Sequence, residues 1–226
     1  MGRAAWRKLA PRLGAEIRRD DALISIYLIR HGDYDELVDG KPVENPGLSA
    51  KGVQQAECLR DRLAHTGEIK ADAIISSPAR RAHETAQIVA SALGAAVILD
   101  EDLEEWRCDR GALSPEEFTA RWRQVPDAQR PYFQWVKGGE SFLELTARVQ
   151  LALNGIWQEH EGKTIVLVTH GGVIQASFAY FFNLSATTIP GISTENTAIT
   201  QWTRTTDANR WTLQRHNDHA HLDALA

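Results

Sequence analysis

Two histidines that each precede a glycine are the residues of this chain best suited to chemistry on an anion. His31 lies in the stretch LIRHG, directly after Arg30, and His170 lies in the stretch VTHGG. A neutral imidazole can act as a nucleophile near pH 7, and the planar guanidinium group of arginine matches the oxygens of a phosphate. The two stretches predict an anion-handling site, provided that the fold brings them together.

Charged residues also follow two further apolar runs. The stretch SSPARR, residues 76–81, carries two adjacent arginines, and the stretch EDLEE, residues 101–105, is acidic. Each feature alone has a structural explanation, because strand-end histidines are often hydrogen-bonded, arginines are often solvated and glycines permit tight turns. Together they favour function, since cations gathered at one cleft repel one another unless an anion binds there, and a nearby carboxylic acid can protonate a leaving oxygen. The combination predicts a metal-free phosphoryl-transfer site.

The elements that must position these groups follow from the hydrophobic pattern. Short apolar runs predict strands at 23–29, 71–76, 96–99 and 164–169. Helical periodicity predicts helices at 48–64, 79–92 and 140–160, and another directly after His170. This alternation is typical of an α/β fold, a three-layer α/β/α sandwich with a mostly parallel sheet. In such sheets ligands bind beyond the carboxyl ends of the strands, where the four charged stretches fall.

Two helices are expected to bury apolar stripes. In the first helix the stripe is Val53, Ala56, Leu59 and Leu63. In the helix at 140–160 it is Phe142, Leu145, Val149 and Ile156. Residues 197–203 and 210–216 are expected to form an antiparallel pair of strands that closes the domain.

Residues 103–138 are predicted to form a helical insertion over the rim of the active site. The stretch SPEE, residues 114–117, marks a helix start, with serine as the N-cap and glutamate three residues later. The insertion carries the aromatic residues Trp106, Phe118, Trp122, Tyr132, Phe133 and Trp135. One or two of them are candidates for a lid over the substrate, but packing beneath the insertion's own helices is the favoured interpretation.

Composition limits the class of protein. With 226 residues, the chain is expected to form a single domain over 23–226 after a basic N-terminal extension, residues 1–22, which either binds a surface or packs on the domain. A net charge of −5 argues against a nucleic-acid partner. No apolar run reaches the length of about 18 residues needed for a transmembrane segment. Cys58 and Cys108 lack metal-ligand spacing and are expected to be reduced thiols in the cytoplasm.

Six motifs in order resemble those of a known family. LIRHG, LSAKGVQQA, SSPARRAHETA, LEE, GGESFLELTARV and VTHGG are similar to the motifs of the histidine phosphatase superfamily, in its phosphoglycerate-mutase-like branch, over about residues 23–220. One RHG motif alone would be weak support, but six motifs with compatible elements between them are specific. The resemblance implies the phosphoglycerate-mutase-like fold.

The resemblance also implies how the phosphoryl group is held. His31 matches the nucleophile that becomes a phosphohistidine, and Arg30 matches the adjacent phosphate-binding arginine. The family's second arginine corresponds to Arg81, which leaves Arg80 as a variable, solvated neighbour. His170 matches the second histidine of the pocket, which binds the phosphoryl oxygens. Arg30, Arg81 and His170 are therefore the predicted phosphate-binding residues.

A carboxylate completes the implied mechanism. The position after LE corresponds to the family's general acid and base, which selects Glu105 over Glu104. Glu140, in the GES segment, is expected to serve the start of a helix. With His31 and His170, Glu105 forms the predicted catalytic set for a two-step hydrolysis of a phosphomonoester. The resemblance calls for no metal and no organic cofactor.

The chain departs from the family pattern after RHG. Residues 33–36 read DYDE, and no asparagine follows until Asn45, whereas mutases usually carry one sooner. The stretch WRCDRGAL and the lack of a mutase-type expansion also favour a phosphatase acting on a phosphorylated small molecule or a phosphoprotein. The alternatives are a cofactor-dependent phosphomutase and a non-catalytic binding module on this fold.

Two other segments have more than one interpretation. His216, His219 and His221 have a spacing that metal ligands can show, but a tail that closes over the sheet is favoured because no second ligand cluster accompanies them. The apolar stretch FAYFF, residues 178–182, is either core or the face of a homodimer.

Overall fold

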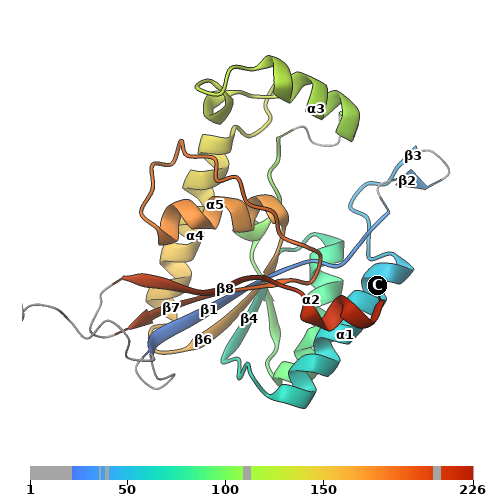
Figure 1. Ribbon diagram of the computed structural model, residues 1–226, viewed down its shortest axis with the longest axis vertical. Helices are drawn as coiled ribbons and strands as arrows, with labels where there is room; N and C mark the ends of the chain where they lie inside the picture. The colour runs from blue at the N-terminus through green and yellow to red at the C-terminus, as the bar shows by residue number, and fades with distance from the viewer. Residues whose placement is uncertain (1–21, 36, 39–40, 109–112, 206–209, 226) are drawn as a thin grey trace, which may run out of the picture.

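The computed structural model describes residues 22–225, except for residues 36, 39–40, 109–112 and 206–209. The predicted basic extension, residues 1–22, lies outside the described residues except for its last residue. In Figure 1, helices surround a central sheet, and a small hairpin of β2 (Leu37–Val38) and β3 (Lys41–Pro42) extends away from it. No helix among the described residues is long and apolar enough to span a membrane.

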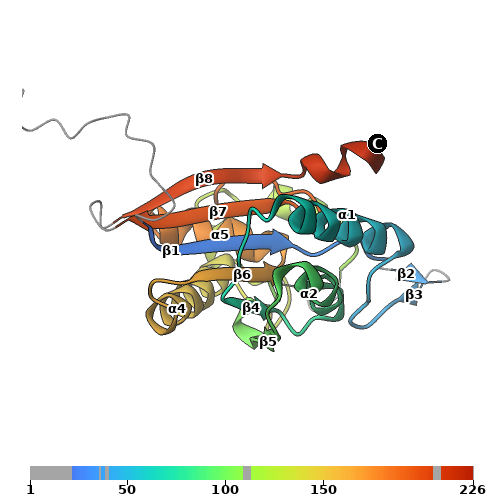
Figure 2. The same cartoon turned by 90° about the horizontal axis from the view of Figure 1, so that it is seen from below.

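The central sheet has six strands. Their spatial order is β5 (Val97–Leu99), β4 (Ala73–Ser76), β6 (Thr164–Thr169), β1 (Ala22–Arg30), β7 (Ile199–Thr205) and β8 (Trp211–Asp218). Figure 2 shows them in this order, with β8 and β5 at the two edges. The first four are parallel to one another, and β7 runs antiparallel to both of its neighbours. The predictions of a mostly parallel sheet and of an antiparallel closing pair are confirmed.

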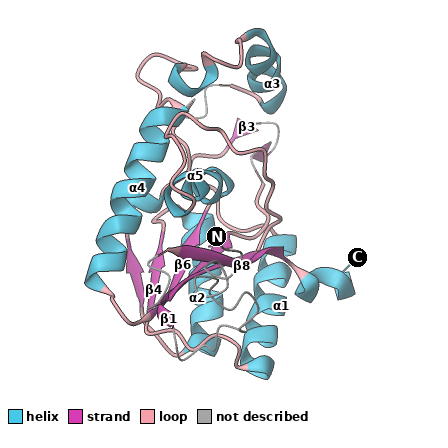
Figure 3. Cartoon of the chain, turned by 60° about the vertical axis from the view of Figure 1, so that its left-hand side comes forward, coloured by secondary structure: helices cyan, strands magenta, loops and turns pink. Residues whose placement is uncertain are grey.

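Helices cover both faces of the sheet, as the three-layer prediction requires. Helices α1 (Ala50–Thr66) and α2 (Arg80–Leu93) pack on one face, and α4 (Phe142–Glu159) and α5 (Gly171–Phe181) pack on the other. Figure 3 shows the sheet between these two pairs. Short 3-10 helices lie at η3 (Glu101–Leu103), η4 (Arg130–Tyr132) and η5 (Ala220–Leu225).

Alternate residues of β1 belong to different layers of the core. Ile26 and Leu28 lie in the cluster formed with α4 and α5, whereas Tyr27 and Ile29 lie in the cluster formed with α1 and α2. All four side chains are buried. A strand that is buried on both faces needs apolar residues at nearly every position, which explains the mostly apolar run at 23–29.

One residue of the stripe predicted for helix α1 does not face inward. The other three residues of the expected stripe are buried, but Val53 is 37% exposed. Gly52 faces inward instead, against the backbone of Asp33, where an added Cβ would collide with a carbonyl oxygen. The prediction for Val53 was wrong because a hydropathy pattern gives no weight to a glycine that packs backbone against backbone. In α4 all four predicted residues are buried.

The insertion is helical, and its aromatic residues pack on one another. Helix α3 (Pro115–Gln124) begins at the predicted N-cap, Ser114, which forms a capping box with Glu117. The rings of Phe118, Trp122 and Trp135 lie 4.9 to 5.9 Å apart between centroids. Figures 1 and 3 show α3 standing apart from the sheet, beyond α5. The packing interpretation is confirmed for these three rings.

The C-terminal histidines make ordinary hydrogen bonds. His216 and His221 pair with threonine hydroxyl groups at 3.0 and 2.9 Å, and His219 donates to a backbone carbonyl at 2.7 Å. Among the residues that the structure describes, no three His, Cys, Asp or Glu side chains gather so as to hold a metal ion. In the stretch FAYFF, Phe178 and Phe181 are buried in the core.

Candidate active site

The register of the sheet brings the two predicted histidines together. β1 and β6 are parallel neighbours, and Arg30 at the end of β1 lies opposite Thr169 at the end of β6. The next residue of each strand is a histidine, so His31 and His170 emerge side by side. Their ring centroids are 5.0 Å apart, and the backbone N–H of His31 donates to the carbonyl of Thr169 at 2.9 Å. Both histidines are buried.

Arg81 joins the two imidazole rings. It lies in the first turn of α2, which follows β4, the other neighbour of β6. Its Nε donates to Nε2 of His31, and one terminal nitrogen donates to Nδ1 of His170, both at 3.2 Å. Arg80 points elsewhere: its side chain is 66% exposed and forms an ion pair with Glu84. The structure therefore brings Arg81, and not Arg80, to the histidines.

These contacts fix the tautomer of His31. Its Nδ1 donates to the carbonyl of Gly32 at 2.7 Å, so the proton of the neutral ring resides there. The lone pair is left on Nε2, the atom that faces Arg81. Burial, and then the charge of Arg81, lower the pKa of His31 to about 3. The ring is thus neutral at pH 7 and presents an unprotonated nitrogen.

His170 is held by a serine that the sequence did not single out. Since Nδ1 accepts from Arg81, Nε2 carries the proton and donates to Oγ of Ser77 at 2.9 Å. Ser77 follows β4 and also accepts the backbone N–H of Ala79 at 3.2 Å. Burial lowers the pKa of His170 well below its usual value, with smaller contributions from nearby charges. This ring is also neutral.

The guanidinium group of Arg30 is anchored at one terminal nitrogen and has a second donor, Nε, that is buried. One of its terminal nitrogens donates to the carbonyl of Thr194 at 2.6 Å, which anchors the guanidinium group. Its Nε is buried and has no hydrogen-bond partner among the described residues. A buried N–H without a partner is costly unless a ligand supplies the acceptor. Beside two histidines and Arg81, an anion is the ligand that suits it.

Glu105 lies in a loop, and its carboxylate reaches the start of α5. Its carboxylate accepts the backbone N–H groups of Gly172 at 3.0 Å and of Trp106 at 2.8 Å. His170 is the N-cap residue of α5, so this carboxylate binds the first turn of the helix that begins at the second histidine. Glu104 instead pairs with Arg107 at 2.7 Å. Of the two predicted alternatives, the structure brings Glu105 toward the site.

Asp33 and Tyr34, the first two residues after RHG, make different kinds of contact. The carboxylate of Asp33 accepts the hydroxyl of Ser49 at 2.8 Å, at the N-cap of α1. Tyr34 lies over the site: its ring centroid is 5.3 Å from that of His31 and 4.7 Å from Cζ of Arg81. Sequence reasoning missed this aromatic contact, because nothing in the local pattern indicates which way a loop side chain turns.

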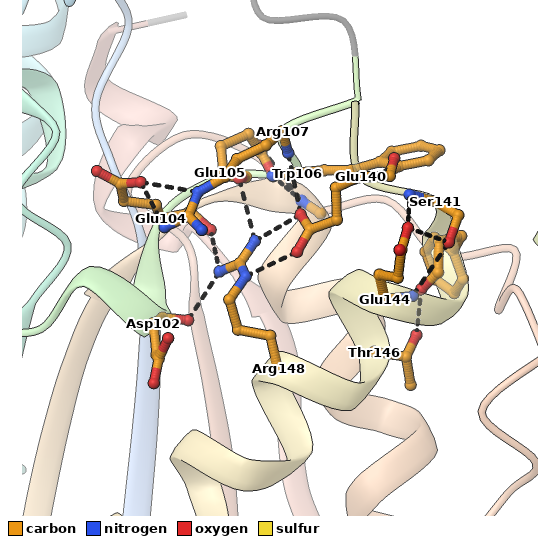
Figure 4. A network of polar contacts seen from close by, with 12 residues as sticks. Asp102, Glu104, Glu105, Trp106, Arg107, Glu140, Ser141, Glu144, Thr146 and Arg148 are labelled. Carbon is orange, nitrogen blue, oxygen red and sulfur yellow. Dashed lines mark hydrogen bonds and ion pairs between the residues drawn. The ribbon is translucent and has the colours of Figure 1, made fainter. Parts of the chain in front are cut away.

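Glu140 does not serve the helix start that was predicted for it. The N-cap of α4 is Ser141, which forms a capping box with Glu144. Glu140 forms a bidentate ion pair with Arg148, at 2.8 and 2.7 Å (Figure 4). The prediction was wrong because a carboxylate one residue before the N-cap is too early to accept from the first turn of the helix.

Comparisons with known proteins identify the family of the chain. The model of the histidine phosphatase superfamily (branch 1) matches residues 26–219. Phosphoglycerate mutase-like protein 4 of Arabidopsis thaliana is 33% identical over 213 residues, which cover 88% of this chain and 86% of the plant protein. Probable phosphoglycerate mutase GpmB of Salmonella paratyphi C is 29% identical over 220 residues, covering 90% and 97%.

A solved structure agrees as well. A mycobacterial glucosyl-3-phosphoglycerate phosphatase, in complex with inorganic phosphate, matches with a TM-score of 0.69 at 25% identity, over 87% of this chain and 98% of that chain. The likeness extends over most of the chain and not merely over the RHG motif. The family model alone covers most of the chain, including both histidine-bearing strands. This chain therefore belongs to branch 1 of the histidine phosphatase superfamily.

Proposed function

We propose that this protein is a metal-independent phosphomonoester hydrolase in which His31 carries the phosphoryl group. The observation that supports this most strongly is the contact of Arg81 with Nε2 of His31, beside the unpartnered Nε of Arg30. A phosphate that replaced the contact between Arg81 and His31 would meet both guanidinium groups and the lone pair of the nucleophile. The two guanidinium groups would neutralise the charge of the phosphate as the lone pair attacks phosphorus.

In the first step, Nε2 of His31 attacks phosphorus in line with the leaving oxygen. The N–P bond forms as the P–O bond to the alcohol breaks, and Glu105, in its protonated form, gives its proton to the departing oxygen. Arg30, Arg81 and His170 bind the three equatorial oxygens. The hydrogen bond from Nδ1–H of His31 to the Gly32 carbonyl keeps the imidazole in the orientation for attack.

In the second step, water hydrolyses the phosphohistidine. Glu105, now a carboxylate, takes a proton from the water as its oxygen attacks phosphorus and the N–P bond breaks. The electron pair returns to Nε2 of His31, phosphate leaves, and the protonated Glu105 is ready for the next substrate. The protein groups end the cycle as they began it.

The substrate is proposed to be a phosphorylated small molecule or a phosphoprotein. The phosphate complex of the mycobacterial relative supports a phosphate-bearing ligand in this fold. A cytoplasmic location is also proposed, because two cysteines are too few for a disulfide framework.

Turnover of p-nitrophenyl phosphate in the presence of EDTA tests the proposal. The wild type is expected to release p-nitrophenol, and the His31→Ala variant is expected to lose that activity. A wild type that turns over no member of a broad phosphoester panel would instead support a non-catalytic binding module. Full activity of His31→Ala would exclude His31 as the nucleophile.

A phosphomutase is the second candidate, because two relatives are named as a mutase-like protein and a probable mutase. A mutase would move phosphate between positions of one substrate and would be stimulated by a bisphosphorylated sugar acid. A hydrolase would release inorganic phosphate at the same rate with or without that compound. Measuring both products from one phosphorylated sugar acid distinguishes the two activities.

A further inference from the structure

The guanidinium group of Arg148, in α4, hydrogen-bonds to Glu140 and to the backbone of the segment that carries Glu105. Its Nε and one terminal nitrogen bind Glu140 at 2.8 and 2.7 Å. The other terminal nitrogen donates to the carbonyls of Asp102 and Glu104, at 2.8 and 2.9 Å. A further bond reaches the carbonyl of Glu105 itself, at 3.3 Å. Figure 4 shows these contacts converging on one guanidinium group.

Glu140 binds the same segment on the other side of Glu105, at Trp106 and Arg107. Its carboxylate accepts the backbone N–H of Arg107 at 3.1 Å, and its own backbone N–H donates to the Arg107 carbonyl at 2.9 Å. Its carbonyl accepts Nε1 of Trp106 at 2.9 Å. The backbone of residues 102–107 is thus held on both sides of Glu105 by a single ion pair.

The ion pair between Arg148 and Glu140 is largely buried, which holds both side chains in place. The side chains of Arg148 and Glu140 are only 10% and 12% exposed. Residues 105–107 belong to no helix or strand, so their backbone groups have no ladder of their own to satisfy them. A buried arginine with five bonds in a planar fork loses little freedom when it holds such a loop in one conformation.

We propose that Arg148, oriented by Glu140, is a positioning residue for proton transfer: it holds the backbone of 102–107 so that the Glu105 carboxyl group reaches the leaving oxygen. This inference rests on the proposed function, in which Glu105 is the general acid. The side chain of Glu105 makes none of the bonds to Arg148 that the structure describes, so it stays available for the reaction while its backbone is fixed.

Two substrates with different leaving groups test the proposal. An alkyl phosphate needs a proton on its departing oxygen, whereas p-nitrophenolate leaves without one. The parameter to compare is kcat/KM, which reports the steps up to departure of the alcohol and not the later hydrolysis of the phosphohistidine. In Arg148→Met and Glu140→Gln, kcat/KM for the alkyl phosphate is expected to fall about 10²-fold, and that for p-nitrophenyl phosphate only a few-fold.

Two further variants serve as controls. Glu105→Gln removes the acid itself and is expected to show the same leaving-group dependence. Arg62→Met removes ion pairs to Glu68 and Asp218, elsewhere in the molecule, and is expected to lower both rates equally if it lowers them at all. Circular dichroism shows which variants fold, and Glu140→Gln, which keeps the shape of the side chain, carries the test if Arg148→Met does not.

The outcomes separate this inference from the proposed function. Equal losses on both substrates, or no loss, in the folded Arg148 and Glu140 variants would overturn the positioning role if Glu105→Gln still discriminates. If Glu105→Gln itself shows no leaving-group dependence, the assignment of the general acid fails, and the positioning role fails with it. The predicted pattern in all three variants supports both.

Discussion

At the scale of single residues, the site combines two neutral imidazoles with two permanent cations. Burial and neighbouring charges lower the pKa of His31 to about 3 and that of His170 well below its usual value. Arg30 and Arg81 supply two guanidinium groups beside these rings. A phosphate dianion entering the site therefore meets cations to bind it and a nucleophile that already has its lone pair.

The two adjacent arginines of α2 are expected to differ sharply in importance. Arg81→Ala removes a donor aimed at both histidines and should lower kcat/KM for p-nitrophenyl phosphate by about 10²- to 10³-fold. Arg80→Ala removes only a largely exposed ion pair and should leave kcat/KM within about twofold of the wild type. Similar losses in both variants would show that the pocket arginine is wrongly assigned.

The buried, neutral His31 should make the fold sensitive to acid. Its pKa is about 3 in the folded protein against 6.5 as the ordinary value, so below pH 6.5 the unfolded chain binds a proton that the folded protein does not. The free energy of unfolding should then fall by about 1.4 kcal/mol for each pH unit, or roughly 2 kcal/mol by pH 5. Stability is retained above pH 6.5 and lost progressively below it.

Urea unfolding of the wild type and His31→Asn at pH 7 and pH 5 checks this linkage. The wild type should lose about 2 kcal/mol more than the variant between the two pH values. The difference between the two proteins matters, because other buried histidines contribute to both. If the two proteins lose equal stability, the lowered pKa of His31 is contradicted.

At the scale of the elements, the sequence predicts well what depends on local pattern. The strands and the helices on both faces follow from periodicity, and the positions of His31 and His170 follow from strand ends and register. The contacts of Ser77 and Arg148 were not predicted, because they join segments far apart in the chain. Arg148, for example, reaches a carbonyl 46 residues away. The contact of Tyr34 with His31 is local, but the sequence does not indicate the direction of a loop side chain.

Helix α1 offers a test of the corrected position of Val53. Val53→Ala, at a position 37% exposed, should change the free energy of unfolding by less than about 0.5 kcal/mol. Leu59→Ala, at a fully buried position of the same helix, should cost about 2 to 5 kcal/mol. Chemical denaturation of the two variants measures both values. A loss in Val53→Ala as large as that in Leu59→Ala would show that Val53 packs inward, as the hydropathy pattern indicated.

At the scale of the whole molecule, an ion cluster ties the C-terminal strand to the end of α1. Arg62 pairs with Glu68 and Asp218 at 2.7 Å each, and Arg215 pairs with the same two acids at 2.7 and 2.8 Å. These side chains are 16 to 21% exposed. The sequence gives no sign of this cluster, since charged residues at those positions are equally compatible with a solvated surface.

Asp218→Asn is expected to lower the free energy of unfolding by about 1 kcal/mol, since it weakens two ion pairs in one network. Salt at about 1 M should reduce the difference from the wild type, because it screens charges that are partly solvated. Asp61→Asn, whose ion pair with Arg60 is 68% exposed on the acid side, should have almost no effect. Equal effects of the two substitutions would mean that the cluster adds no stability.

The central claim, that His31 is the nucleophile, is tested most directly by trapping the phosphoenzyme. The protein is mixed with a radioactively labelled phosphomonoester, quenched in alkaline denaturant, and mapped by peptide. The label is expected on the peptide that contains His31, to be lost on brief acid treatment, and to be absent from His31→Ala. A wild type that turns over the substrate without any label on His31 would contradict the account.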